Sequence, residues 1–245
     1  MNPKAYLEMA EVESQHWWFV GRRAITRSFI VAMELPPKAS ILEVGCGTGG
    51  NLSLLAEFGL VSAFEMNEEA LIIAQERMQN QCQISYGCCP EEIPFLNQRF
   101  DLICLFDVLE HIDEESITLL KLQSLLKDNG RMLITVPVHD WLFSNHDKFL
   151  HHKRRYSLNQ FKQLIAKSNL TIERVSYFNF FLFPAAILTR VKEKLFNTHT
   201  GDRLPNKLTN TILKVIFISE KYFLRALNFP TGLSIICSIK KNKCP

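Results

Sequence analysis

Short apolar runs and longer amphipathic stretches alternate along most of the chain. Runs that end at glycine, proline or polar residues predict buried strands over 40–44, 61–65, 82–86, 100–106, 131–136, 171–178 and 234–240. Between them, the spacing of apolar residues predicts helices over 50–58, 68–79, 114–127 and 158–168, the third stopped by a turn at 128–130. Strands that alternate with helices are typical of an α/β fold, in which a mostly parallel sheet has helices on both faces.

Two helical regions accompany this alternation. Residues 4–33 have helical spacing, with Gly21 as a candidate break, and Pro36-Pro37 ends the section. About 55 residues separate the last two predicted strands, which is far more than a hairpin needs. We therefore predict a single domain over 1–245. Its parts are an N-terminal helical segment (1–36), a core (37–178), a helical insertion (179–231), and a last strand with a tail (232–245).

Composition narrows the class of protein. A hydrophobic fraction of 47% is that of a globular protein, and a net charge of +3 is too small to indicate a nucleic-acid partner. The seven cysteines include no CxxC pair, so we expect reduced thiols in a cytoplasmic protein and no structural zinc. The N-terminus has no apolar core typical of a signal peptide, and the longest uncharged run, of 15 residues, is too short to span a membrane.

A glycine-rich turn, EVGCGTGG (43–50), follows the first predicted strand. Glycines let the backbone turn tightly and approach a ligand, and the next helix offers free N–H groups at its N-terminus. Glu65, 22 residues after Glu43, ends the second predicted strand, where a carboxylate can accept hydrogen bonds from ribose hydroxyls. The turn also satisfies GxGxxG, so these residues alone fit either a nicotinamide dinucleotide or S-adenosylmethionine (SAM).

Three features favour SAM. Glu43 precedes the glycines, where its charge suits the cationic amino group of a methionine moiety and would repel a pyrophosphate. The segments GCCPEEIPF (87–95) and FDLICLFDVLEHI (100–112) then follow in order. With these motifs the chain resembles the class I SAM-dependent methyltransferases from about Ile41 to Val136. The resemblance implies a Rossmann-like sheet of seven strands with the last one antiparallel, an N-terminal helical lid, and a helical insertion before the last strand.

The resemblance also implies which residues bind the cofactor. The turn would hold the methionine end, Glu65 the ribose, and Met66 the adenine. Cys88 or Cys89 stands where the family usually has Asp or Ser near the adenine amine. The residues expected to bind SAM are Glu43, Gly45, Cys46, Gly47, Gly49, Glu65, Met66, Cys88, Cys89 and Asp107.

A polar segment, HDWLFSNHDKFLHHKRRY (139–156), follows the fifth predicted strand at the carboxyl end of the sheet, where open α/β sheets bind ligands. His146 and Asp147 are candidates for an imidazole–carboxylate pair, and the two arginines at 154–155 for a clamp on a phosphate or carboxylate. The segment also fits a polar loop that caps the next helix at Ser157. Its Asp and His residues lack a clean ligand spacing, so we expect no metal.

The same segment resembles a subgroup of bacterial class I methyltransferases that is often associated with glycan or lipid-linked pathways. The subgroup carries H-D followed by H-x-R-R-Y here, and an opening H-W-W-F…R-R that matches 16–19 and 22–23. We expect the aromatic opening either to fold over the cofactor as a lid or to pack as a core helix. The residues expected to contact the acceptor are Trp17, Arg22, Arg154, Arg155 and Tyr156.

The predicted activity is methyl transfer from SAM to a small-molecule, glycan or lipid-linked acceptor. An oxygen acceptor would need a base, and the candidates are His152, His146 and His111, in that order. Glu110 and His111 fit either an acid/base role or simple packing beside the sheet. An NAD(P)-dependent oxidoreductase and a non-catalytic SAM-binding scaffold remain as alternatives.

The insertion has one basic stripe. On a helix predicted over 207–227, Lys207, Lys214, Lys221 and Arg225 fall within roughly 40° of one another at about 100° per residue. A basic amphipathic helix is typical of contact with an anionic membrane surface. It also fits a cap over the active site or a homodimer face. Peripheral contact with the inner face of the membrane through 180–227 is therefore one of three alternatives.

Overall fold

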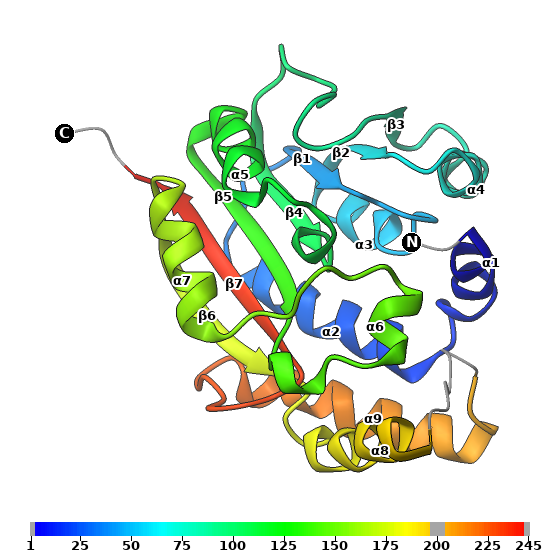
Figure 1. Cartoon of the computed structure of the whole chain (residues 1–245). Helices are drawn as coiled ribbons and strands as arrows, with labels where there is room; N and C mark the ends of the chain where they lie inside the picture. Colours follow the sequence, from blue (N-terminus) through cyan, green and yellow to red (C-terminus); the bar gives the residue numbers. More distant parts are fainter. Residues whose placement is uncertain (1–2, 197–203, 243–245) are drawn as a thin grey trace.

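The computed structural model describes residues 3–196 and 204–242. Within these residues the chain forms a seven-stranded sheet in the order β3-β2-β1-β4-β5-β7-β6 (Figure 1). The strands are β1 Ala39–Val44, β2 Gly59–Glu65, β3 Gln83–Tyr86, β4 Phe100–Phe106, β5 Leu126–Pro137, β6 Leu170–Phe178 and β7 Ser234–Lys241. β7 is antiparallel to β5 and β6, and the other paired strands are parallel. The predicted α/β sheet with an antiparallel last strand is confirmed.

Side chains of each strand alternate between two helical layers. One layer contains α2 (Trp17–Ala32), α3 (Leu52–Ala56), α4 (Glu68–Met78) and α9 (Lys207–Phe223), and the other contains α5 (Glu115–Ser124) and α7 (Leu158–Lys167). Along β4, Leu102 and Cys104 join the first core while Ile103 and Leu105 join the second. Because both faces are covered, the strand is apolar almost throughout, as its sequence indicated.

The N-terminal segment is two helices, and the prediction of a break at Gly21 is wrong. α1 (Pro3–Val12) ends before His16, whose side chain accepts a hydrogen bond of 3.3 Å from the Trp18 N–H and so caps α2. Gly21 lies inside α2 against α9, where a Cβ atom would come within 2.2 Å of the Phe217 ring. The glycine therefore allows two helices to pack closely, which the sequence pattern alone did not distinguish from a helix break.

β5 begins earlier than predicted, and the turn expected at 128–130 is part of it. The Phe100 N–H donates to the Leu125 carbonyl at 2.8 Å, and the register between β4 and β5 shifts at this point. Gly130 lies where a Cβ atom would come within 2.7 Å of the Phe100 carbonyl oxygen. The glycine accommodates a bulge between the strands, and α5 has already ended at Ser124.

The insertion between β6 and β7 contains α8 (Phe183–Phe196) and α9, which lie at the end of the sheet where β7 begins (Figure 1). The Phe217 ring of α9 stacks on Trp18 of α2, with centroids 5.3 Å apart. Among the described residues, no helix is both long and apolar enough to cross a membrane. Three short elements follow β4 and β5 and contribute to the site: η1 (Leu109–His111), η2 (Asp140–Leu142) and α6 (Asn145–Phe149).

Candidate active site

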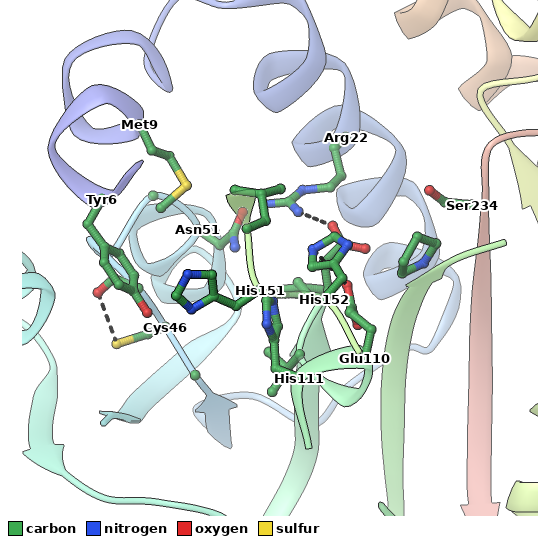
Figure 2. Close-up of a pocket in the computed structure, with 18 of the residues that line it drawn as sticks. Tyr6, Met9, Arg22, Cys46, Asn51, Glu110, His111, His151, His152 and Ser234 are labelled. Atoms are coloured by element: carbon green, nitrogen blue, oxygen red, sulfur yellow. Dashed lines mark hydrogen bonds and ion pairs between the residues drawn. The ribbon is translucent and has the colours of Figure 1, made fainter. Parts of the chain in front are cut away.

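A cavity of about 1400 Å³ lies at the carboxyl ends of the central strands. Its lining comes from α1, α2, the glycine turn, the segments that follow β4 and β5, and part of α8. In Figure 2, Tyr6, Met9 and Cys46 lie on one side of the cavity, and Glu110 and His152 lie on the other. The predicted cofactor turn and the predicted histidine-rich segment therefore open onto the same space.

The glycine turn binds the carboxylate of Glu65, which ends β2. Gly47 has a φ of 54°, in the left-handed region that favours glycine, and its N–H donates to Glu65 Oε2 at 2.9 Å. The N–H groups of Met66 and Asn67 donate to the other oxygen at 3.0 and 2.9 Å. Backbone donors thus hold an acidic side chain at the cavity wall, where it can also accept hydrogen bonds from a ligand.

Glu43 lies at the base of the turn and is 1% exposed. Asn51 donates to its Oε1 at 2.9 Å, but its Oε2 has no hydrogen-bond partner among the described residues. Burial raises the pKa of Glu43 to about 8, although the hydrogen bond from Asn51 opposes this shift. An unpartnered carboxylate oxygen beside an open turn suits a cationic amino group and disfavours a pyrophosphate, so these residues fit SAM.

Helix α1 covers the glycine turn. The Tyr6 hydroxyl donates to Glu65 Oε1 at 3.3 Å, and the terminal carbon of Met9 lies 3.4 Å from the position that a Cβ atom on Gly47 would occupy. Burial, and then the charge of Glu65, raise the pKa of the Tyr6 hydroxyl well above its usual range, so it remains a donor. The N-terminal segment thus lies over the turn.

Glu13, between α1 and α2, connects the N-terminal segment to the glycine turn and to α4. Its carboxylate is buried, accepts a hydrogen bond of 2.7 Å from the Thr48 hydroxyl and pairs with Arg77 of α4. Its backbone carbonyl accepts from the Arg23 side chain at 2.6 Å. The contacts join α1, the glycine turn and α4 in one network.

The aromatic opening of α2 packs mainly into the core. The Trp18 ring stacks on Phe178 of β6 as well as on Phe217 of α9. Trp17 meets the Phe217 ring edge-on, at 5.7 Å between centroids, and also lines the cavity. Of the two expectations for this segment, packing as a core helix is the one that these contacts support, whereas the cover over the glycine turn comes from α1, outside the aromatic opening.

An ion pair between Arg22 and Asp107 lies on the cavity wall where the two sides meet. Asp107 directly follows β4 with a φ of 57°, which is strained for a residue with a side chain. Its N–H donates to the backbone carbonyl of Thr135 at 3.1 Å, and the Thr135 hydroxyl donates to its Oδ1 at 3.2 Å. These contacts hold the Asp107 carboxylate in a defined place beside the pocket.

On the opposite side, Asp147 holds His152. The His152 Nδ1 atom lies 3.0 Å from Asp147 Oδ1, which also accepts from Arg155 Nε at 2.8 Å. Although burial opposes it, the hydrogen bonds from His152 and Arg155 hold the pKa of Asp147 well below its usual range. An ionised Asp147 favours the tautomer of His152 with the proton on Nδ1, which leaves Nε2 as an acceptor.

Glu110 and His111 of η1 stand beside His152. Glu110 is fully buried, burial raises its pKa well above the usual range, and neither of its oxygens has a hydrogen-bond partner among the described residues. The rings of His111 and His152 are 4.8 Å apart, and burial, followed by the charge of His152, lowers the pKa of His111 to about 3. One ligand atom from each of Glu110, His111 and His152 lies within 4.8 Å of the others, a spacing that could hold a metal ion.

The expected clamp on a substrate anion has no support in the contacts. Arg155 is buried and pairs with Asp147, and Arg154 pairs with Glu115 of α5. The Tyr156 hydroxyl also donates to Glu115, at 3.1 Å. Carboxylates of this chain therefore neutralise both guanidinium groups. Of these three predicted residues, only Arg155 lines the cavity.

The other predicted site residues are distributed as follows. Those that line the cavity are Trp17, Arg22, Gly45, Cys46, Gly47, Glu65, Met66, Cys88, Cys89, Asp107, His111, His146 and His152. Glu43 and Gly49 are buried behind the lining. The predicted helix cap is confirmed, because the Ser157 side chain accepts from the Gln160 N–H at 3.2 Å.

Several residues that complete the site were not predicted from the sequence: Tyr6, Met9, Glu13 and Asn51. The first three belong to a helical segment with no motif of its own, so nothing local marked them. Asn51 had a signal that was overlooked. It stands at the start of the helix after the glycine turn, where a polar side chain can reach back to the acidic residue before the turn.

Comparison with known protein families agrees with this geometry. A family model described as a methyltransferase domain matches residues 8–175. The ubiquinone biosynthesis O-methyltransferase of Coxiella burnetii is 32% identical over 98 residues, covering 39% of this chain and 42% of that protein. The ubiquinone/menaquinone biosynthesis C-methyltransferase of Xanthomonas oryzae is 27% identical over 117 residues, covering 44% of this chain and 46% of that protein. The chain thus matches less than half the length of these curated relatives.

Solved structures share the fold at low sequence identity. A SAM-dependent methyltransferase from Clostridium acetobutylicum has a TM-score of 0.59 at 12% identity, covering 90% of this chain and 91% of that one. A phosphoethanolamine N-methyltransferase from Haemonchus contortus, in complex with SAM, has a TM-score of 0.59 at 17% identity, covering 89% of this chain and 53% of that one. Because these similar proteins are named for oxygen, carbon and nitrogen acceptors, similarity does not identify the acceptor atom here.

Proposed function

Because the chain belongs to the methyltransferase domain family and has the fold of SAM-dependent methyltransferases, we propose that it transfers the methyl group of SAM to a hydroxyl group, with His152 as general base. One observation carries this proposal. A histidine that is oriented by an ionised carboxylate, at 3.0 Å from Asp147, lines the same cavity as the glycine turn.

Residues of the glycine turn and its neighbours would hold the cofactor. Glu65 would accept hydrogen bonds from the ribose hydroxyls, and Glu43 would receive the amino group of the methionine end. Met66, Cys88 and Cys89, which also line the cavity, would lie beside the adenine. When bound, SAM supplies a methyl group that is electrophilic because it is attached to a sulfonium sulfur.

His152 would take the proton of the acceptor. Its Nε2 atom accepts that proton as the acceptor oxygen becomes nucleophilic, and the imidazolium that forms is stabilised by Asp147. Arg155 and the backbone N–H of Ser144, at 2.8 and 2.9 Å, keep the Asp147 carboxylate in place. An oxygen of Glu110 lies 3.9 Å from His152 Nε2, and burial raises the pKa of Glu110 well above its usual range, which disfavours a competing anion there.

Positioning would supply much of the remaining rate. Reacting groups held in alignment avoid the entropic cost of an encounter, which can contribute about 7 to 11 kcal/mol. The cover formed by α1 and the ion pair of Arg22 with Asp107 would restrict water and fix the cavity wall between donor and acceptor.

The acceptor we propose is a small molecule, a glycan or a lipid-linked compound that enters from the side of His152. The same proposal places the enzyme in the cytoplasm, because the described cysteines are free thiols and a reducing compartment keeps them so.

The test uses the purified protein with isotopically labelled SAM and cell extracts separated into polar and lipid fractions. We expect the label to appear in one compound of the extract, as a methyl ether formed from its hydroxyl group. With that acceptor, His152→Ala should lower kcat by about 10² to 10⁴, while the affinity for S-adenosylhomocysteine, measured by thermal shift, stays unchanged. Added imidazole should restore part of the rate.

Three results would overturn the proposal or a part of it. A thermal shift with NADH and none with S-adenosylhomocysteine would assign the cavity to a dinucleotide. Binding of S-adenosylhomocysteine without transfer to any extract fraction would favour the non-catalytic scaffold, and full turnover by His152→Ala would remove the base.

A further inference from the structure

The outward side of α9 exposes large apolar side chains. Leu208 is 72% exposed and Val215 is 61% exposed, and Leu188 of α8 is 72% exposed. Other exposed apolar residues of this region are Leu204, Ile212, Tyr222, Phe223 and Leu227. Single exposed apolar residues are ordinary, but a group of this kind on one element marks an interaction surface.

This apolar side is not the one that stabilises the fold. At about 100° per residue, Leu208, Val215 and Tyr222 point away from the side of the helix that carries Phe217 and Leu224. Phe217 and Leu224 are buried against the sheet. The helix thus has two apolar sides, one packed on the core and one facing outward, and the second has no partner among the described residues.

A basic edge borders the outward apolar side. Lys207, Lys214, Lys221 and Arg225 follow one another along α9 and its end, and none of them forms an ion pair with a described carboxylate. The Lys221 ammonium lies 5.0 Å from the Tyr222 ring, which leaves its charge available. Apolar side chains flanked by unpaired cations are typical of helices that lie in the interface of an anionic bilayer.

The charge of this surface disfavours a second copy of the chain as its partner. Among the described side chains of 180–227, the only carboxylate is that of Glu220, which is buried and accepts hydrogen bonds from the N–H groups of Asn179 and Phe181. A twofold contact through this surface would bring lysines together, and the described side chains of this region offer no exposed carboxylate to pair them. An anionic surface instead complements the basic edge.

Segments of the insertion on the N-terminal side of α9 line the cavity. Ala186, Thr189 and Arg190 of α8 do so, as do Leu204 and Pro205 just before α9. The outward surface on α9 therefore begins, at Lys207, two residues after the cavity wall at Pro205.

We propose that the outward side of α9, with Leu188 of α8, docks on an anionic membrane surface. The apolar side chains insert among the acyl chains, and the four basic residues contact lipid phosphates. This goes beyond the proposed methyl transfer and does not depend on it, because docking requires neither SAM nor an acceptor.

The experiment is flotation of the intact protein with vesicles of phosphatidylcholine alone and with vesicles of equal parts phosphatidylcholine and phosphatidylglycerol. The wild type should float with the anionic vesicles, less at high salt, and stay in solution with the neutral ones. Replacing Lys207, Lys214 and Lys221 with Gln should weaken binding by about a hundredfold. Replacing Leu208, Ile212 and Val215 with Ser should abolish flotation even at low salt.

Matched controls lie elsewhere on the surface. Changing Lys38, Lys162 and Lys167 to Gln removes the same charge from exposed positions away from α9, and should leave flotation unchanged. Leu60→Ser with Leu96→Ser removes exposed apolar side chains elsewhere and should also have no effect.

Equal loss of flotation in both lysine triples would show only a general charge effect and overturn the proposal. No flotation of the wild type would overturn it as well. If sedimentation shows a dimer that the Ser triple converts to a monomer, while vesicle binding is unchanged, this surface is a homodimer interface instead.

Discussion

The two walls of the cavity are built in different ways. The cofactor wall consists of the glycine turn, Glu65 and Glu43, which come from two consecutive strand ends and are held largely by backbone N–H groups. The opposite wall, where we propose that the acceptor binds and which we call the acceptor wall, consists of η1, the segment 146–155 and α8, and it is held by ion pairs between side chains. A cofactor common to a family can be bound by backbone geometry, whereas an acceptor particular to one enzyme is recognised by side chains that can be exchanged.

Electrostatics separate the walls further. On the cofactor wall, the buried Glu43 has one oxygen without a hydrogen-bond partner among the described residues, where the amino group of SAM would bind. On the acceptor wall, Asp147 is already paired with Arg155 and His152. The first wall is therefore set to bind charge, and the second to orient an imidazole.

The largest effect is expected from removing the carboxylate of the cofactor wall. Glu65→Ala deletes two acceptors for ribose hydroxyls and should weaken binding of S-adenosylhomocysteine by about a hundredfold, measured by calorimetry. The control is Glu76→Ala on α4, an exposed carboxylate that should leave affinity unchanged. Equal affinity of both variants would mean that the cofactor wall is not where the nucleoside binds.

Protonation of Glu43 gives the next effect. Because its pKa is raised to about 8, the folded protein retains a proton that the unfolded chain loses above its ordinary pKa of 4.5. The free energy of unfolding should therefore fall as pH rises through this window, by at most about 1.4 kcal/mol per pH unit. Glu43→Gln should lack this slope. Between about pH 5.5 and about pH 7.5, the free energy of unfolding from urea denaturation should therefore fall by about 2 to 3 kcal/mol more in the wild type than in Glu43→Gln. Parallel slopes would contradict the assignment.

A smaller effect tests the junction that supports both walls. Gly21→Ala should lower the free energy of unfolding by about 1 to 3 kcal/mol, because the added Cβ meets the Phe217 ring. The direction of this change in stability is informative, since alanine ordinarily stabilises a helix by about 1 kcal/mol relative to glycine. Combining it with Phe217→Leu should recover part of the loss, and a stabilised Gly21→Ala protein would show that α2 and α9 are not in close contact.

The smallest effect concerns the acceptor wall. Treatment with EDTA should leave methyl transfer unchanged, because in the proposed mechanism Nε2 of His152 takes the proton of the acceptor and does not bind a metal ion. The measurement is turnover before and after chelation, with added Mg²⁺ and Zn²⁺ in turn. Loss of activity that one of these ions restores would make Glu110, His111 and His152 a metal centre and remove the histidine base.

The two walls also differ in how far the sequence predicted them. The glycine turn and Glu65 follow consecutive strands, so the order of elements was enough to bring them together. The pairing of His152 with Asp147 within one segment was only partly anticipated, because His146 was the expected partner. The approach of Glu110 to His152 depends on how two loops fold against each other, and the Lys153 N–H to Glu110 carbonyl bond that joins them leaves no periodic signal.

Residues that act through packing were the least predictable. Gly21 and Gly130 each suggested an end to a helix, but both permit a close approach to an element far away in the sequence. The same holds for Glu13, which contacts residues of the glycine turn and α4. A pattern along the chain reports local preference, whereas these positions are decided by the neighbour that arrives in the folded state.

The antiparallel direction of β7 has a further consequence for how such a protein can change. Since Phe178 at the end of β6 is paired with Ser234 at the start of β7, the insertion leaves and rejoins the sheet at adjacent positions. A different segment could be spliced between these two residues without rethreading the chain, provided that it replaced the buried contacts of Phe217 and Leu224. Exchanging the segment between these two residues, in evolution or by design, would therefore change the proposed acceptor side and the proposed docking surface together. The glycine turn and its strands would stay unchanged.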